Sequence, residues 1–160
     1  GIFAIGDCTL GPMLAHKASE EGILVAEHMS GAKAPIKITH VPWIIYTWPE
    51  IAWVGPSEQF LRKTKKEINI GKFPFRASGR SHARGETDGF VKIIAEKDND
   101  QILAVHILGA NASELISEAV TAMEFGATSE DVARTIHGHP TLSESMHEAA
   151  LATQGNAIHY

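Results

Sequence analysis

The residue types best suited to proton transfer gather in one short segment of the sequence. It reads His137-Gly138-His139-Pro140-Thr141-Leu142-Ser143-Glu144, with His147 and Glu148 just beyond. Pro140 disfavours the helical conformation for His139, so the His139 ring should project from a loop. Glu144 should lie on the first turns of a helix, where its carboxylate can fold back and accept a hydrogen bond from one imidazole nitrogen. The other nitrogen would then exchange protons, as a general base held by an orienting group does.

Two other interpretations of these residues remain open. In the first, His139 only caps the helix and Glu144 is a solvated surface carboxylate. In the second, His137, His139 and His147 converge on a metal ion. A His-x-His pair binds metal well on a strand, where residues i and i+2 share a face, but this pair lies in a Gly-Pro loop. We therefore expect no metal site.

The last third of the sequence is predicted to be helical, and it would position this segment. A helix over 112–125 would be followed by Gly126 and would gather its apolar side chains on one face: Leu115, Ile116, Ala119, Val120 and Met123. Ser129 is expected to cap a second helix that ends near residue 136. Pro140 is expected to start a third helix that ends near residue 153.

The middle of the sequence is rich in β-branched and aromatic runs. Five strands are predicted, over residues 41–46, 51–54, 68–75, 90–95 and 102–108. Asp98-Asn99-Asp100 is typical of a hairpin turn, so the strands should pair mostly antiparallel. Ser57 is expected to cap a short helix that ends near residue 65. The predicted fold is α+β: a mostly antiparallel sheet of about five strands, flanked by helices.

The first 35 residues have a different character. Residues 2–5 form an apolar run between glycines, which predicts a buried parallel strand, with Cys8 as a buried residue beyond it. Gly11-Pro12 should open a helix that ends at Gly31, and residues 31–35 resemble a linker. We therefore divide the chain into a strand–helix remnant of an α/β unit, residues 1–35, and an α+β domain, residues 36–160. Because a strand begins at once, we expect the chain to be a fragment.

Composition limits the classes of partner. Hydrophobic residues make up 44% of the 160 residues, enough for a folded core. The formal net charge of −5 argues against nucleic acid or an anionic membrane as a partner. No apolar run approaches the roughly 18 residues that a membrane span needs. The single cysteine excludes a disulfide within the chain.

Three separated motifs resemble the flavin disulfide reductases. Residues 139–144 are similar to the active-site signature of that family, and residues 46–55 to the motif that opens its interface domain. Ala4-Ile5-Gly6-Asp7, together with residues 11–18, is similar to its second flavin-contacting segment. The match covers essentially the whole chain in the correct order. Leu142 and the following helix resemble the dihydrolipoyl dehydrogenases more than the glutathione or trypanothione reductases.

The resemblance implies a role for each matching residue. His139 would take a proton from dihydrolipoamide and return it to a thiolate, and Glu144 would orient His139 and stabilise its charged form. Asp7 would hydrogen-bond the ribityl chain of FAD. The flavin would be lined at a helix N-terminus by Met13, Leu14, Ala15 and His16. Residues 1–35 would then be a remnant of the FAD-binding domain. Trp48 stands where family members often have histidine, which puts a polar contact from that position in doubt.

The resemblance also implies partners and a compartment. It implies a homodimer in which His139 serves the other subunit, and dihydrolipoamide substrates carried on the lipoyl domains of 2-oxo acid dehydrogenase complexes. The cofactors would be FAD and NAD, and the compartment a bacterial cytoplasm or a mitochondrial matrix. The redox disulfide of the family needs two cysteines, and no Gly-x-Gly-x-x-Gly loop is present. We therefore expect this chain alone to be catalytically silent.

Two alternatives to an enzyme of this kind stay open. The chain could be a non-catalytic dimerisation or docking module of a 2-oxo acid dehydrogenase complex. It could also belong to another reductase of the same fold, such as mercuric reductase, although the cysteine pair near the end of that enzyme has no counterpart here.

Overall fold

The computed structural model describes residues 1–32 and 38–160, and the chain divides into two compact units. The first unit spans residues 1–41 and the second residues 42–160. Of the predicted linker over residues 31–35, residues 33–35 lie outside the described residues. Gly31 lies within them, and its φ of +83° ends the preceding helix as predicted.

The first unit contains a short 3-10 turn, η1 (Gly6–Cys8), and one long helix, α1 (Ala15–Met29). The predicted strand over residues 2–5 is wrong. A strand needs a neighbour to satisfy its backbone groups, and the described residues of this unit contain no strand that could pair with it. Cys8, expected to be buried beyond that strand, is exposed.

The start of α1 also differs from the prediction. The helix begins at Ala15 rather than at Gly11-Pro12. Gly11 has a φ of +109°, and Leu14 is still in the extended conformation, so neither belongs to a right-handed helix. A network at the buried amine of Lys17 holds the η1 loop to α1. The amine lies 2.6 Å from Glu21 and donates to the Thr9 hydroxyl, while the Gly6 N–H donates to Glu21.

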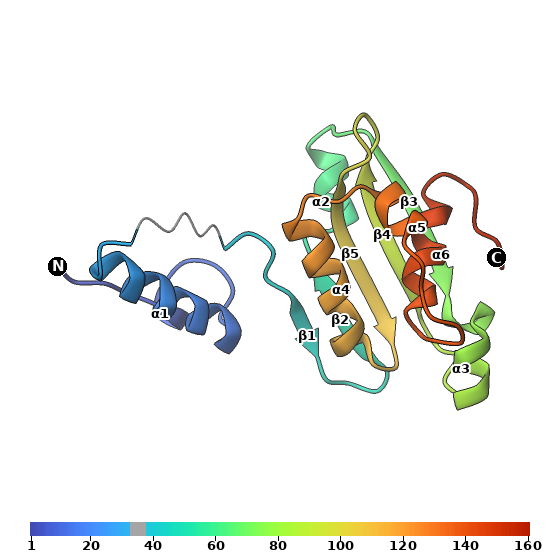
Figure 1. Ribbon diagram of the computed structural model, residues 1–160, viewed down its shortest axis with the longest axis horizontal. Coiled ribbons are helices and arrows are strands. Elements are labelled where there is room, and N and C mark those ends of the chain that lie inside the picture. The colour runs from blue at the N-terminus through green and yellow to red at the C-terminus, as the bar shows by residue number, and fades with distance from the viewer. Residues whose placement is uncertain (33–37) are drawn as a thin grey trace. The chain divides into compact units, whose positions relative to one another are not determined.

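The second unit is built on one five-stranded sheet, shown in Figure 1. The strands are β1 (Trp43–Ile45), β2 (Glu50–Val54), β3 (Ile68–Pro74), β4 (Phe90–Glu96) and β5 (Ile102–Gly109). They pair antiparallel in the order β1-β2-β5-β4-β3, which confirms the predicted strands and fold class. The predicted cap at Ser57 is also confirmed, because its hydroxyl accepts the Phe60 N–H at the start of α2 (Glu58–Lys63).

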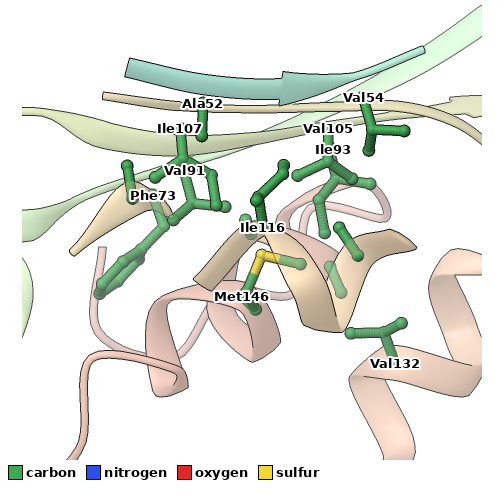
Figure 2. Close-up of a cluster of buried hydrophobic side chains, with 14 of the residues drawn as sticks. Ala52, Val54, Phe73, Val91, Ile93, Val105, Ile107, Ile116, Val132 and Met146 are labelled. Carbon is green, nitrogen blue, oxygen red and sulfur yellow. The ribbon is translucent and has the colours of Figure 1, made fainter. Parts of the chain in front are cut away.

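Three helices cover one face of this sheet: α4 (Ala112–Glu124), α5 (Ser129–Arg134) and α6 (Glu144–Ala152). Figure 2 shows the resulting core, in which Ile116 from α4, Val132 from α5 and Met146 from α6 meet the apolar side chains of the sheet. The predicted apolar face of α4 is confirmed, since Ile116, Ala119 and Met123 are buried. Within the described residues, no helix combines the length and apolar character needed to cross a bilayer.

In the second unit, one helix was not predicted and two helices start at other residues than predicted. Helix α3 (Gly79–Arg84) was missed, although Ser78 caps its start and Gly85 ends it with a φ of +69°. The cap of α5 is Thr128 rather than Ser129, in a capping box with Asp131. Helix α6 begins at Glu144 rather than at Pro140. Side chains satisfy the preceding turn, because the Thr141 N–H donates to the Glu144 carboxylate and the Thr141 hydroxyl to the Gly138 carbonyl.

A glycine in β3 lets α6 approach the sheet closely. A Cβ atom at Gly71 would overlap the Ala149 carbonyl oxygen of α6 and lie 2.6 Å from the Thr153 nitrogen. The backbones of β3 and α6 are therefore in direct contact at this point. This contact helps to fix the position of α6, the helix that carries Glu144 and Glu148.

Candidate functional site

His139 and Glu144 lie together at the start of α6, as the spacing predicted. The Nδ1 atom of His139 lies 2.8 Å from a carboxylate oxygen of Glu144. The His139 side chain is 80% exposed and that of Glu144 29% exposed. The imidazole therefore projects outward from the loop while the carboxylate that holds it is partly sheltered.

The Glu144 carboxylate is fixed by two donors. One oxygen faces the His139 ring, and the other accepts the Thr141 N–H at 2.8 Å. Partial burial by itself raises the pKa of Glu144, but the Thr141 N–H and the His139 ring outweigh it, so the pKa lies below its ordinary value. Glu144 is therefore an anion at neutral pH, suited to hold an imidazole and to stabilise its charged form.

This geometry sets the tautomer of the His139 ring. A carboxylate only accepts hydrogen bonds, so Nδ1 carries the hydrogen and Nε2 presents a lone pair. Within residues 1–32 and 38–160, no group bonds Nε2. The pair therefore presents one basic nitrogen to the surroundings, which is the arrangement of a general base.

His137, two residues earlier in the same loop, lies in the opposite setting. Its Nε2 atom lies 2.7 Å from Glu118 of α4, and its Nδ1 atom 2.9 Å from the Thr135 carbonyl oxygen. The side chain is only 6% exposed, and its ring stacks on His147 of α6 at a centroid distance of 5.4 Å. Both ring nitrogens have a partner. The contacts with Glu118 and His147 therefore hold the loop against α4 and α6.

These contacts argue against convergence of the three histidines on a metal. The Nε2 atom of His147 is 2.9 Å from the Ala133 carbonyl oxygen, so it too is engaged by the protein. The described part of the chain contains no group of three or more side chains that could hold a metal ion.

A cleft of about 580 Å³ opens beside His139 and Glu144. The residues that line this cleft include some that the sequence spacing did not predict, among them Ile158 and His159. Glu148, one turn after Glu144 on α6, accepts three hydrogen bonds from that segment. The sequence carried no local signal for this contact, because Glu148 and His159 are 11 residues apart.

The residues predicted to contact the flavin lie in the first unit. Asp7 and Met13 are exposed, on the loop that precedes α1, and Ala15 and His16 begin the helix. No side chain caps this helix end, and Leu14 occupies the cap position. Backbone N–H groups at the start of α1 can therefore receive a polar or anionic group, which fits the chemistry of a dinucleotide cofactor.

Trp48 lies outside the tryptophan stack. The Trp43 and Trp53 rings stack at 5.5 Å across β1 and β2. Trp48 is 76% exposed and precedes a cis peptide bond to Pro49. Trp43 and Trp53 therefore pack on each other, whereas most of the Trp48 side chain is exposed.

Known proteins resemble the chain along nearly all of its length. The family model described as pyridine nucleotide-disulphide oxidoreductase, dimerisation domain, matches residues 41–150. A dihydrolipoyl dehydrogenase of Cupriavidus necator is 57% identical over 152 residues, which are 95% of this chain and 32% of that protein. The mitochondrial dihydrolipoyl dehydrogenase of Homo sapiens is 50% identical over 160 residues, 99% of this chain and 31% of that protein. The chain thus spans about a third of the length of these relatives.

Solved structures agree with the sequence relatives. The crystal structure of LpdA from Mycobacterium tuberculosis superposes with a TM-score of 0.85 at 30% identity, over 92% of this chain and 32% of that one. The flavoprotein disulfide reductase RclA of Escherichia coli superposes with a TM-score of 0.82 at 23% identity, over 90% of this chain and 34% of that one. The second likeness supports the fold alone.

Proposed function

This chain belongs to the pyridine nucleotide-disulphide oxidoreductases, and on that premise we propose that it is the part of a dihydrolipoyl dehydrogenase that carries the dimerisation domain. Its contribution to the reaction is acid–base chemistry by His139 and Glu144. The observation that carries the proposal is the 2.8 Å contact between His139 Nδ1 and Glu144, which leaves Nε2 without a partner among the described residues.

The proposed step is the removal of a thiol proton. Nε2 of His139 takes the proton from one S–H group of dihydrolipoamide, and an N–H bond forms as the S–H bond breaks. The imidazolium that results lies against the Glu144 carboxylate, whose negative charge stabilises it. When the imidazolium later returns its proton to a thiolate, His139 is ready for another turnover.

The redox chemistry belongs to groups outside this chain. FAD, NAD and a redox disulfide would supply the transfer of two electrons in the full-length enzyme. The uncapped start of α1 and the exposed Asp7 and Met13 suit a contact with part of FAD. Because the chain has one cysteine, we propose that the chain alone does not reduce NAD with dihydrolipoamide.

The partners follow from the same premise. We propose a homodimer through residues 42–160, with His139 serving the flavin and disulfide of the second subunit. The substrate would be dihydrolipoamide on lipoyl domains of 2-oxo acid dehydrogenase complexes. Because relatives include a bacterial protein and proteins named mitochondrial, we propose a bacterial cytoplasm or a mitochondrial matrix as the compartment.

The test is the variant His139→Gln in the full-length enzyme. Glutamine cannot accept the thiol proton, so oxidation of dihydrolipoamide should slow by about 10²-fold or more while FAD stays bound. Stopped-flow measurement of flavin reduction separates this step from the later transfer to NAD. The control is His82→Gln, since the His82 ring bonds the Arg76 carbonyl outside the cleft. Unchanged turnover in His139→Gln would refute the proposed role.

A further inference from the structure

The cleft contains a second imidazole–carboxylate pair, formed by His159 and Glu148. The His159 Nδ1 atom lies 2.6 Å from one carboxylate oxygen of Glu148. The other oxygen of Glu148 accepts the N–H groups of Ile158 at 2.9 Å and His159 at 3.3 Å. The Glu148 side chain is 5% exposed, whereas the His159 side chain is 66% exposed. A buried carboxylate thus holds an exposed ring here, whereas the carboxylate of the first pair is only partly sheltered.

The second pair repeats the first at the distance of one helical turn. Glu144 and Glu148 are four residues apart on α6, which places them on the same side of the helix. Each accepts a hydrogen bond from an Nδ1 atom, and both imidazoles line the same cleft. Within residues 1–32 and 38–160, neither Nε2 atom has a hydrogen-bond partner. Two imidazoles, each with an Nε2 atom that no described group bonds, therefore line one cleft.

Electrostatics link the two pairs. Burial raises the pKa of Glu144, while the Thr141 N–H, the His139 ring and the positive charge of a protonated His159 lower it. Burial likewise raises the pKa of Glu148. The His159 ring and the two backbone N–H groups lower it by more than burial raises it, so the pKa lies below its ordinary value. Both carboxylates are anions at neutral pH, and each can stabilise a charged imidazole.

The proposed reaction releases a second proton, which the second pair can accept. A dithiol that becomes a disulfide loses two protons as well as two electrons, and one imidazole nitrogen holds only one proton. We propose that His159 is the second proton acceptor of the cleft, with dithiols as the substrate class. This inference rests on the proposed function.

Both protons and both electrons of the dithiol have an acceptor in the proposed step. One S–H proton of the dithiol goes to His139 and the other to His159, and an S–S bond forms in the substrate. The two electrons break the redox disulfide of the full-length enzyme and leave two thiolates. Two imidazolium ions therefore form with two thiolates, and the exposed ring of His159 then releases its proton to water.

The test uses His159→Asn in the full-length enzyme with FAD bound. Asparagine keeps an N–H that can reach Glu148 but cannot take up a proton. Because His139 remains, flavin reduction by dihydrolipoamide should slow by about 10-fold, less than a sole general base contributes. The pH profile of that step should lose one inflection, because one proton acceptor is removed. Added imidazole should restore part of the rate.

The matched control is Tyr160→Phe, which alters the neighbouring residue but keeps the ring packed edge-on against Phe73. A wild-type rate and pH profile in His159→Asn, with wild type and Tyr160→Phe active, would overturn only this inference. A slower rate with an unchanged pH profile and no rescue by imidazole would also overturn it, because a purely structural role predicts that result. Absence of flavin reduction in the wild-type enzyme would overturn the proposed function and this inference with it.

Discussion

The two halves of the loop between α5 and α6 place the same side chain in opposite settings. In the first half, His137 is 6% exposed and has both ring nitrogens engaged, by Glu118 and by the Thr135 carbonyl. In the second half, His139 is 80% exposed and has one nitrogen engaged, by Glu144. Each histidine has a carboxylate partner at 2.7–2.8 Å, so the presence of such a partner does not separate them.

The difference lies in the second nitrogen. A ring that is bonded at both ends and buried holds the loop in place, whereas a ring bonded at one end can exchange a proton at the other. The first half of the loop therefore supports the second. If this comparison is correct, variants of the two halves should separate stability from activity.

The largest expected effect is on activity, in Glu144→Gln of the full-length enzyme. Glutamine keeps an acceptor oxygen but loses the charge that stabilises the His139 imidazolium. Oxidation of dihydrolipoamide should slow by roughly 10²-fold, measured as kcat at saturating NAD. The matched variant in the other half is Glu118→Gln, which should keep near wild-type activity. Equal losses of activity in both variants would contradict the different roles of the two halves of the loop.

The second largest effect is expected for the variant His137→Leu, on the stability of the 160-residue chain. Leucine removes the bonds to Glu118 and Thr135, so the free energy of unfolding should fall by about 2 kcal/mol. Urea unfolding followed by tryptophan fluorescence measures it. His139→Gln is the control and should change the free energy of unfolding by less than about 0.5 kcal/mol, because its side chain is exposed. A larger loss in His139→Gln than in His137→Leu would contradict the assignment of roles.

A smaller effect is expected at the start of α5, which leads into the loop. Thr128→Ala removes the hydroxyl that accepts the Asp131 N–H, and the free energy of unfolding should fall by about 1 kcal/mol. Thr128→Ser keeps the hydroxyl and should restore most of this loss. A large drop in activity with unchanged stability would show that α5 does more than support the loop.

The smallest effect is on the pH dependence of stability. The pKa of Glu144 is lower in the folded chain than its ordinary value, so its ionised form favours folding. This contribution is present above the unfolded-state pKa of about 4.3 and is lost as the pH falls through the lower folded-state value. Because the side chain is 29% exposed, we expect less than about 1 kcal/mol.

The measurement compares wild type with Glu144→Gln in urea at several pH values. The difference in the free energy of unfolding should be greatest near neutral pH and should shrink in acid. A difference that grows as the pH falls would contradict a pKa of Glu144 that is lower in the folded chain.

Local patterns were enough to predict the five strands, their antiparallel pairing and the first imidazole–carboxylate pair, but not the order of the strands in the sheet. Apolar runs and a hairpin turn indicate β4 and β5. Glu144 follows Pro140 by four residues, which brings its carboxylate within reach of the His139 ring. Each of these features depends on residues close together in the sequence, where backbone geometry limits the outcomes.

Contacts between distant residues could not be predicted in this way. Glu118 and His137 are 19 residues apart in the sequence, and Glu148 meets His159 because the chain turns back after α6. The error over residues 2–5 has a related cause. An apolar run predicts burial, but a strand forms only where another strand pairs with it.

The glycine at position 71 limits which substitutions the chain tolerates. Position 71 lies on β3, apart from the cleft, yet any substitution there would push against the Ala149 carbonyl of α6 and the nitrogen of Thr153, which caps the end of α6. Even alanine at this position would force β3 and α6 apart, and α6 carries both Glu144 and Glu148. A scan of all substitutions would therefore mark Gly71 as intolerant, although it contributes no atom to the chemistry.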